Sequence, residues 1–348
     1  MDHPETDAAS LTPLETHCEW RSDELGGSYV WDLTDAHIAE LDAALDHAEA
    51  HTKDVLEITR EHFPLPTLGP ELRRVTDELI NGRGVVLIRG LPAGRYSKDR
   101  ASSIYWGVGM HLGHPWPQNV KGHLLGDVTD QGKAYDDPTS RGNEIGGLPF
   151  PFHSDGSDLV GLFCLDPGLR GGASIVANAL AIHNELVRTE PDLAAELYKP
   201  FPYDFRGEQA PGNRGWYEMP VFSRCADRLF VRYIRPYIEA SRRHDDAPRV
   251  SAAARAAMDR LDELCADPAF HVSMQLQVGD MQFVNNHHVL HARTAYEDDR
   301  PNRKIRHLKR LWLETELIRD DDKPERFRLG RTDSYWARQG PTKSDVVV

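Results

Sequence analysis

The sequence predicts an α+β protein, with helices at the front of the chain and a sandwich or barrel of short strands behind them. Three observations support this prediction. Apolar residues at helical spacing dominate the first third of the chain. Short apolar runs separated by Gly, Pro, Asn and Asp follow. No repeat of fixed period runs through the chain. Many short strands with turns between them favour such a core over alternating βαβ units.

Three helices are predicted ahead of the strand-rich part. Residues 34–51 carry apolar side chains at helical spacing, behind a cap at Thr34 or Asp35. Residues 69–80 form the second helix, and the third begins at Lys98. The spacing therefore predicts a helical layer that covers whatever sheet follows it.

Short apolar runs mark the predicted strands. Two further helices interrupt them, near residues 181–198 and 251–265. The stretches 119–149 and 201–250 are long and poor in strand signals, so both are candidate lids. The predicted strands are 85–91, 159–165, 173–179, 228–234, 271–278, 281–286 and 309–315.

Composition predicts one large domain in a soluble, cytoplasmic protein. No run approaches the roughly 18 apolar residues of a membrane span, and the first residues lack the pattern of a secretory signal. The polar residues 1–25 are expected to be mobile, residues 26–335 to form the domain, and residues 336–348 to be a frayed tail.

Charge and cysteine content exclude several classes of function. Lys and Arg number 41 against 55 Asp and Glu, a formal charge of −14, which argues against a nucleic-acid or anionic-membrane surface. The four cysteines form no C-x-x-C pair, so they predict reduced thiols rather than a zinc knuckle or disulfide framework. Cys164 is expected in the core.

Two His-x-Asp triplets occur, about as many as chance alone gives. The one formed by His244 and Asp246 lies in a charged run, which predicts a solvated surface. The other, His153 and Asp155, follows an extended Pro-Phe-Pro-Phe segment and precedes a predicted strand. In an extended chain, residues two apart point the same way, so these two side chains can converge on one ion.

Further metal ligands are available at the end of the predicted strand 281–286. The histidines His287, His288 and His291 follow it closely. Two histidines and one carboxylate, with open positions beside them, are the ligand set of non-haem Fe(II) oxygenases. From these residues alone, capping of a strand end explains the histidines equally well.

Three motifs together give a specific resemblance. The segments PFHSDGSD, RGGASIVANALAIHNEL and NNHHVLHARTAYEDDRPNRKIRHLKRLWL resemble, in order and spacing, the TauD/TfdA family of Fe(II)/2-oxoglutarate-dependent dioxygenases, in the clavaminate synthase-like group. The likeness spans about residues 84–317. It implies a double-stranded β-helix, a distorted jelly roll, with flanking helices and a variable lid.

The resemblance also implies a ligand set for iron. His153 and Asp155 match the family's first ligand pair, and His291, followed by a small residue and Arg, matches its distal histidine. His287 and His288 remain rivals for that third position. The carboxylate of Asp155 favours hydroxylation, since related halogenases replace it with a small residue.

The co-substrate site follows from the same resemblance. Arg306 matches the family's arginine for the distal carboxylate of 2-oxoglutarate, Ser174 matches its hydroxyl partner, and Arg310 could assist. Arginine can hold a carboxylate through two parallel hydrogen bonds, which lysine cannot do. Arg303 is a rival better explained as a surface charge, and Asn285 departs from the aspartate common in the family, which alters hydrogen bonding near the metal.

The activity implied is hydroxylation of an unactivated C–H bond of a small molecule, such as an amino acid or another small acid. Fe(II), 2-oxoglutarate and O2 take part, and succinate and CO2 are released. Desaturation and cyclisation stay open as variants, a non-catalytic binding module on the same fold is the alternative, and a zinc hydrolase is the third candidate.

Substrate contacts are the least specific expectation, because aromatic and polar residues of this kind also pack in cores. No nucleic-acid or membrane partner is expected, and a homo-oligomer is left open. The candidates are Trp116, Gln118, Asn119 and Arg235, with Arg232 and Tyr237 nearby.

Overall fold

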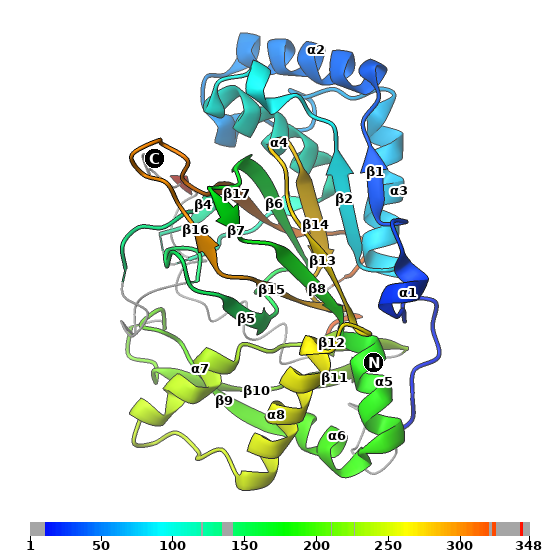
Figure 1. Cartoon of the computed structure of the whole chain (residues 1–348), viewed down its shortest axis with the longest axis vertical. Helices are drawn as coiled ribbons and strands as arrows, with labels where there is room; N and C mark the ends of the chain where they lie inside the picture. The colour runs from blue at the N-terminus through cyan, green and yellow to red at the C-terminus, as the bar shows by residue number, and fades with distance from the viewer. Residues whose placement is uncertain are drawn as a thin grey trace.

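Two β-sheets form the centre of the fold, and helices lie beyond them at both ends of the long axis (Figure 1). The computed structural model describes residues 11–119, 121–133, 142–209, 211–225, 227–319, 322–324 and 342–343. The expected α+β class is confirmed, with helices preceding most of the strands.

The larger sheet mixes early and late segments of the chain. Its neighbouring strands are antiparallel, except for the parallel pairs β1/β2 and β18/β4. The late strands β14 and β17 are inserted between early ones. In spatial order the strands are β1 (Val30–Asp32), β2 (Val85–Arg89), β14 (Met281–Asn285), β6 (Leu159–Asp166), β17 (His307–Glu314), β4 (His123–Val128) and β18 (Thr342–Lys343), and β3 (His114–Pro115) also pairs with β17.

The smaller sheet has four antiparallel strands and the same kind of mixing. Its order is β13 (His271–Met274), β8 (Ser174–Asn178), β15 (Val289–Arg293) and β5 (Phe150–His153). The register of β15 against β5 sets His291 directly opposite His153. Residues far apart in the sequence therefore become neighbours through strand pairing.

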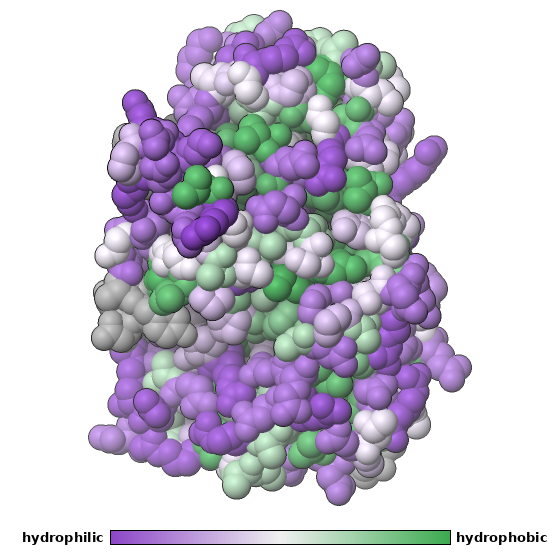
Figure 2. Space-filling model, in the orientation of Figure 1, coloured by the Kyte–Doolittle hydropathy of each residue, from purple (hydrophilic) through white to green (hydrophobic). Residues whose placement is uncertain are grey.

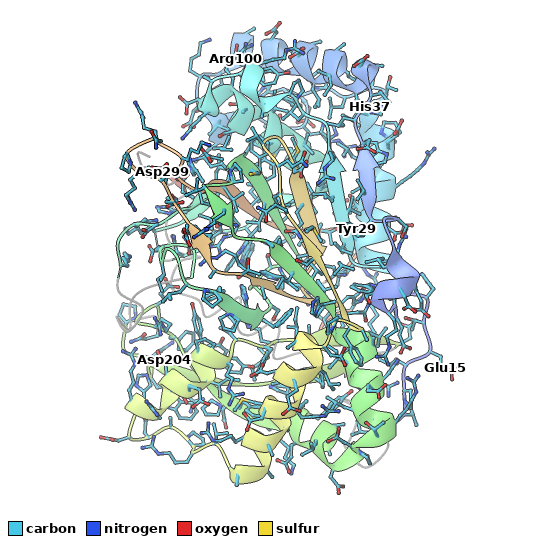
Figure 3. All side chains as sticks on the ribbon, viewed as in Figure 1. Glu15, Tyr29, His37, Arg100, Asp204 and Asp299 are labelled. Atoms are coloured by element: carbon cyan, nitrogen blue, oxygen red, sulfur yellow. The ribbon has the colours of Figure 1, made fainter. Side chains whose placement is uncertain are left out.

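Helices α2 (Asp35–His51), α3 (Leu68–Asn81) and α4 (Lys98–Leu112) form one helical layer, as the sequence predicts. The Thr34 hydroxyl caps α2 by accepting from the His37 N–H. Aromatic residues fill the interface between this layer and the larger sheet, where the ring of Tyr105 stacks on Phe163. At the outer edge, Arg100 binds carboxylates of α2 (Figure 3).

The opposite end of the molecule contains more strand than the sequence predicts. Two hairpins lie within the expected strand-poor stretch 201–250. Prolines such as Pro202 obscure the first hairpin, because proline normally argues against a strand interior but is tolerated in a two-stranded ribbon. In the second hairpin, the later strand lies within the predicted strand 228–234, and only its partner was missed. The hairpins are β9 (Pro200–Asp204) with β10 (Trp216–Pro220), and β11 (Phe222–Cys225) with β12 (Arg228–Val231); beside them lie α5 (Ala179–Thr189), α6 (Pro191–Leu197), α7 (Arg235–Ala240) and α8 (Ala252–Ala266).

Short elements complete the described fold. They connect or extend the larger elements and contribute little to the core. They are α1 (Ser22–Leu25), the 3-10 turns η2 (Val55–Glu57), η3 (Ala93–Arg95) and η4 (Ser241–Arg243), and the paired strands β7 (Arg170–Gly171) and β16 (Tyr296–Glu297).

Residues 11–25, the described part of the segment expected to be mobile, make specific contacts with the rest of the fold. The backbone of Leu14 exchanges two hydrogen bonds with the buried side chain of Asn184, and the Trp20 indole donates to the Arg83 carbonyl. A few apolar residues hold this polar stretch against the rest of the fold. Amino-acid composition alone does not predict such contacts. Residues 1–10 and the expected mobile tail lie outside the described residues, apart from β18.

The surface agrees with the composition. The face in Figure 2 is mainly hydrophilic, with hydrophobic residues interspersed. No helix in the described ranges is long and apolar enough to cross a membrane. The four cysteines are buried free thiols, and Cys164 lies in the core as expected.

Candidate metal centre and binding pocket

His153, Asp155 and His291 converge at one end of the smaller sheet. Each offers a ligand atom within 4.8 Å of the other two. The His291 Nε2 lies 3.7 Å from Asp155 Oδ2, and the His153 Nε2 lies 4.0 Å from Asp155 Oδ1. Among the described residues, no other three His, Cys, Asp or Glu side chains gather in this way.

The protonation states of this group suit a divalent cation. The His153 Nδ1 lies 2.9 Å from the Pro151 carbonyl, which places its proton there and leaves the Nε2 lone pair facing the group. Burial lowers the pKa of His153 to about 3, so its imidazole is neutral. Burial opposes the ionisation of Asp155, but Arg310 and the two histidines outweigh it and hold its pKa well below the usual range. Two histidines and one carboxylate are a ligand set that fits a ferrous ion.

The two rival histidines do not join the group. His287 lines the same pocket, but its Nε2 lies 3.0 Å from the carboxylate of Asp158. His288 is buried elsewhere, and burial lowers its pKa to about 3. The difference follows from their positions, because His291 lies within strand β15 whereas His287 and His288 lie in the turn before it.

One face of β17 lines the pocket beside the three converging residues. Leu308, Arg310 and Trp312 alternate along β17 and line the pocket, as strand geometry predicts, and Arg306, just before the strand, lines it as well. The Trp312 indole donates to Asp155 Oδ2 at 3.0 Å. Sequence reasoning missed Trp312, although the same alternation that implicates Arg310 includes it.

Arg306 is a buried guanidinium without an anion. Its side chain is 3% exposed, its Nη2 donates weakly to the Gly172 carbonyl at 3.4 Å, and its Nη1 has no hydrogen-bond partner. Burial and the nearby Arg293 lower the pKa of Arg306 to about 10. No carboxylate of the described residues forms an ion pair with it. An unpaired buried charge is costly, so this site suits an anionic ligand.

Two small residues shape the space around Arg306. Gly172 has φ +70°, and a Cβ there would lie 2.6 Å from the Arg306 Nε, so glycine is required. Ser174 is buried at the pocket wall, and its hydroxyl donates to the Gln282 side chain at 2.8 Å. The lone pairs of that hydroxyl can still accept a hydrogen bond.

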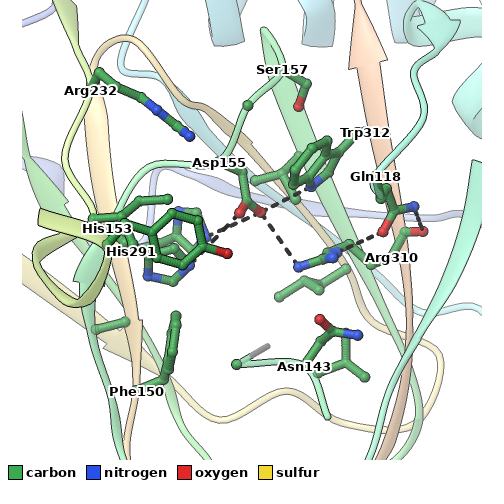
Figure 4. A pocket seen from close by; sticks show the side chains of 18 of the residues that line it. Gln118, Asn143, Phe150, His153, Asp155, Ser157, Arg232, His291, Arg310 and Trp312 are labelled. Carbon is green, nitrogen blue, oxygen red and sulfur yellow. Dashed lines mark hydrogen bonds and ion pairs between the residues drawn. The ribbon is translucent and has the colours of Figure 1, made fainter. Parts of the chain in front are cut away.

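Arg232 and Arg310 flank Asp155 from opposite sides (Figure 4). The Arg310 Nε donates to the Gln118 amide oxygen at 2.8 Å, and its Nη1 lies 3.8 Å from Asp155 Oδ2. The Arg232 Nη1 donates to the Ser154 carbonyl at 2.9 Å. Burial lowers the pKa of Arg232, but Tyr217 outweighs burial and raises it. The pocket is therefore strongly cationic on both sides of the candidate metal centre.

The structure brings only some of the expected substrate contacts to the pocket. Gln118 lines it, but Asn119 instead accepts from the backbone of Lys121 and His123. Trp116 packs beside the Trp312 backbone, outside the lining residues.

The structure does not bring Arg235 to the pocket. It begins helix α7 and forms 2.6 Å ion pairs with Asp259 and Asp262 of α8, away from the pocket. Arg232, three positions earlier, lines the pocket instead, together with Tyr237. Sequence alone could not separate these arginines, because the chain changes from extended to helical between them.

The two candidate lids both contribute lining residues. Gly142 and Asn143 come from the first, and Phe205, Tyr217 and Met219 come from the second. The sequence did not predict these residues individually as pocket residues. The only indication was that each belongs to a long stretch with few predicted strands.

Comparison with known proteins decides the family. The model of the family "Taurine catabolism dioxygenase TauD, TfdA family" matches residues 34–312. The chain belongs to this family. The resemblance drawn from the three motifs is therefore confirmed, and so is the expected class of enzyme, a dioxygenase.

Relatives in the TauD/TfdA family extend over nearly the whole chain. FR-33289 synthase of Streptomyces rubellomurinus is 30% identical over 312 residues, which cover 87% of this chain and 91% of that protein. The taurine hydroxylase-like protein SAT17 of Stachybotrys chartarum is 26% identical over 311 residues, covering 86% and 79%.

Solved structures share the fold. An asparagine oxygenase in complex with Fe(II), hydroxyasparagine and succinate superposes with a TM-score of 0.63 at 18% identity, covering 84% of this chain and 98% of that one. The non-haem iron oxygenase OrfP, in complex with Fe, succinate and hydroxyarginine, gives 0.62 at 16% identity, covering 84% and 97%. Iron and 2-oxoglutarate or succinate, the expected cofactors, are present in structures of these two proteins.

Proposed function

We propose that this protein is an Fe(II)- and 2-oxoglutarate-dependent hydroxylase of a small acid. One observation carries the proposal: the converging His153, Asp155 and His291 share a pocket with the unpaired, buried guanidinium of Arg306. The first feature suits a ferrous ion, and the second suits a carboxylate. In a metal-binding module that does not use 2-oxoglutarate, the buried charge of Arg306 would have no ligand to bind.

The two sheets support the finer description of the fold. Each sheet combines strands from early and late parts of the chain, and the three proposed ligands lie at the end of the smaller one. We describe this arrangement as a double-stranded β-helix. Strand β4 takes the earlier part of the stretch 119–149 into the larger sheet, so we propose residues 142–149 and the described part of 201–250 as its lids.

Each side chain has a distinct task in the proposed reaction. His153, Asp155 and His291 hold the iron, while Arg306 and Ser174 bind the distal carboxylate of 2-oxoglutarate. Iron with 2-oxoglutarate supplies the oxidation of an unactivated C–H bond by O2, with release of succinate and CO2. The protein positions the substrate and excludes water from this site.

Arg310 is better assigned to the substrate than to the co-substrate. Four residues along a strand span about 13 Å, so its Cα lies far from that of Arg306. Its guanidinium lies beside Asp155 and opposite Arg232. These two arginines are proposed to bind the acidic group of the substrate, with Tyr217 and Tyr237 as walls.

Anaerobic titration with Fe(II) followed by 2-oxoglutarate tests the proposal directly. We expect one equivalent of iron to bind, and 2-oxoglutarate to change the visible absorption of the iron protein. A screen of amino acids and other small acids should then identify a substrate that stimulates succinate release. Absence of both iron binding and the spectral change would rule the proposal out.

Replacing Arg232 by methionine tests the substrate assignment. We expect KM for the substrate to rise about 30-fold or more, because truncating one partner of a buried charge pair costs about 2–5 kcal/mol. Arg235→Met is the matched control, since that arginine faces α8. An equal rise in KM for both variants would contradict the assignment.

A further inference from the structure

The turn that carries Asp155 has no β-ladder to hold it. His153 ends β5 and pairs with His291 of β15, so strand register fixes both imidazoles. Residues 154–158 lie between β5 and β6 and belong to neither strand. The third member of the candidate metal centre therefore depends on other contacts for its position.

Asn286 supplies these contacts at the middle of the turn. Its Oδ1 accepts from the Asp155 backbone N–H at 3.1 Å, and its Nδ2 donates to the Ser157 carbonyl at 3.0 Å. Its own backbone N–H donates to the Asp158 carbonyl at 2.9 Å. The side chain is 1% exposed and is not among the residues that line the pocket. Asn286 thus contacts the turn and not the space where substrate or metal would lie.

Both ends of the turn are held independently of the Asn286 side chain. At its start, the Ser154 N–H donates to the Tyr233 carbonyl at 2.9 Å. At its end, the carboxylate of Asp158, fully buried, lies 3.0 Å from the Lys323 Nζ and accepts from the Thr315 N–H. Loss of the Asn286 amide should therefore let the middle of the turn shift while its two ends stay in place.

We propose that Asn286 is a positioning residue that sets the Asp155 carboxylate against the two histidines. This inference rests on the proposed iron site. Without the amide, the buried Asp155 N–H and Ser157 carbonyl lose their partners, and buried polar groups without partners reorient to find new ones. A rotation of the Asp155 backbone would carry its carboxylate away from the ligand atoms of His153 and His291.

The neighbouring asparagine offers a matched control. Asn285 is also buried, but its Nδ2 donates to the Leu79 carbonyl at the end of α3, and its Oδ1 accepts from the His287 N–H. None of these side-chain bonds reaches residues 154–158. Alanine at either position removes the same chemical group and two buried hydrogen bonds or more, so general destabilisation should be similar.

The experiment compares Co(II) binding by the wild-type protein, Asn286→Ala and Asn285→Ala. Cobalt binds such sites and reports its coordination through visible absorption. We expect the dissociation constant to rise about 10- to 100-fold in Asn286→Ala, the range typical of residues that support a ligand, and the absorption band to change. Asn285→Ala should stay within about threefold with an unchanged band, the loss limited to its melting temperature.

The outcomes separate this inference from the proposed function. Binding by Asn286→Ala with wild-type affinity and spectrum overturns the inference alone, as does an equal loss in Asn285→Ala. Failure of the wild-type protein to bind Co(II) or Fe(II) overturns the proposed function and this inference with it. Preserved melting behaviour in Asn286→Ala with weakened binding supports a positioning role over a purely structural one.

Discussion

Replacing Asp155 by alanine should abolish metal binding while leaving the fold intact. The dissociation constant for Fe(II) or Co(II) is expected to rise by more than about 100-fold, beyond the effect of a residue that only supports a ligand. The reason is that Asp155 is the one carboxylate of the converging group and the proposed source of its negative charge. Anaerobic metal titration and succinate release both report the loss.

The second His-x-Asp triplet provides the control for this variant. Asp246 is exposed and lies outside the pocket, although it stands two places after His244 just as Asp155 does after His153. Asp246→Ala should bind metal as the wild-type protein does. Tight metal binding by Asp155→Ala would show that the ligand set is wrong.

Replacing Arg306 by alanine should weaken 2-oxoglutarate binding by about 100-fold. Loss of one partner of a buried, hydrogen-bonded charge pair costs about 2–5 kcal/mol, and each 1.4 kcal/mol is about tenfold in affinity. Fe(II) binding should be unaffected, because Arg306 contacts none of the three converging residues. The measurement is the 2-oxoglutarate dependence of the visible spectrum of the iron-loaded variant.

Two further arginine variants sharpen this test. Arg306→Lys keeps the charge but not the paired donors of the guanidinium, so it should recover only part of the affinity. Arg303→Ala removes an exposed arginine three residues away and should change nothing. Unaltered 2-oxoglutarate binding in Arg306→Ala would remove the main support for an oxygenase of this type.

The sequence predicted those parts of the site that strand periodicity and motif spacing encode. His153, Asp155 and Arg306 belong to contiguous motifs, and the alternation of an extended chain predicted that His153 and Asp155 converge, although Asp155 lies in the turn that follows β5. Arg235 was misplaced because a helix begins at that residue, and a two-residue alternation no longer applies there.

Contacts between distant segments produce no local sequence pattern, so the sequence did not predict them. The bonds from Asn286 to the Asp155 turn join residues 131 positions apart, and a single asparagine in a polar turn carries no signal of its partner. The anchoring of Leu14 on Asn184 spans 170 positions and was missed for the same reason. The prolines of β9 obscured the first hairpin in 201–250, whereas the later strand of the second hairpin was predicted.

The order of strands in the larger sheet has a consequence for synthesis of the chain on the ribosome. The early strands β2, β6 and β4 are separated from one another by β14 and β17, which are among the last described segments to be made. A nascent chain that ends before residue 281 holds these strands without their neighbours, and pairing over such separations is slow. It also lacks His291. With the proposed ligand set, we therefore expect iron to be bound only after nearly the whole chain has been made.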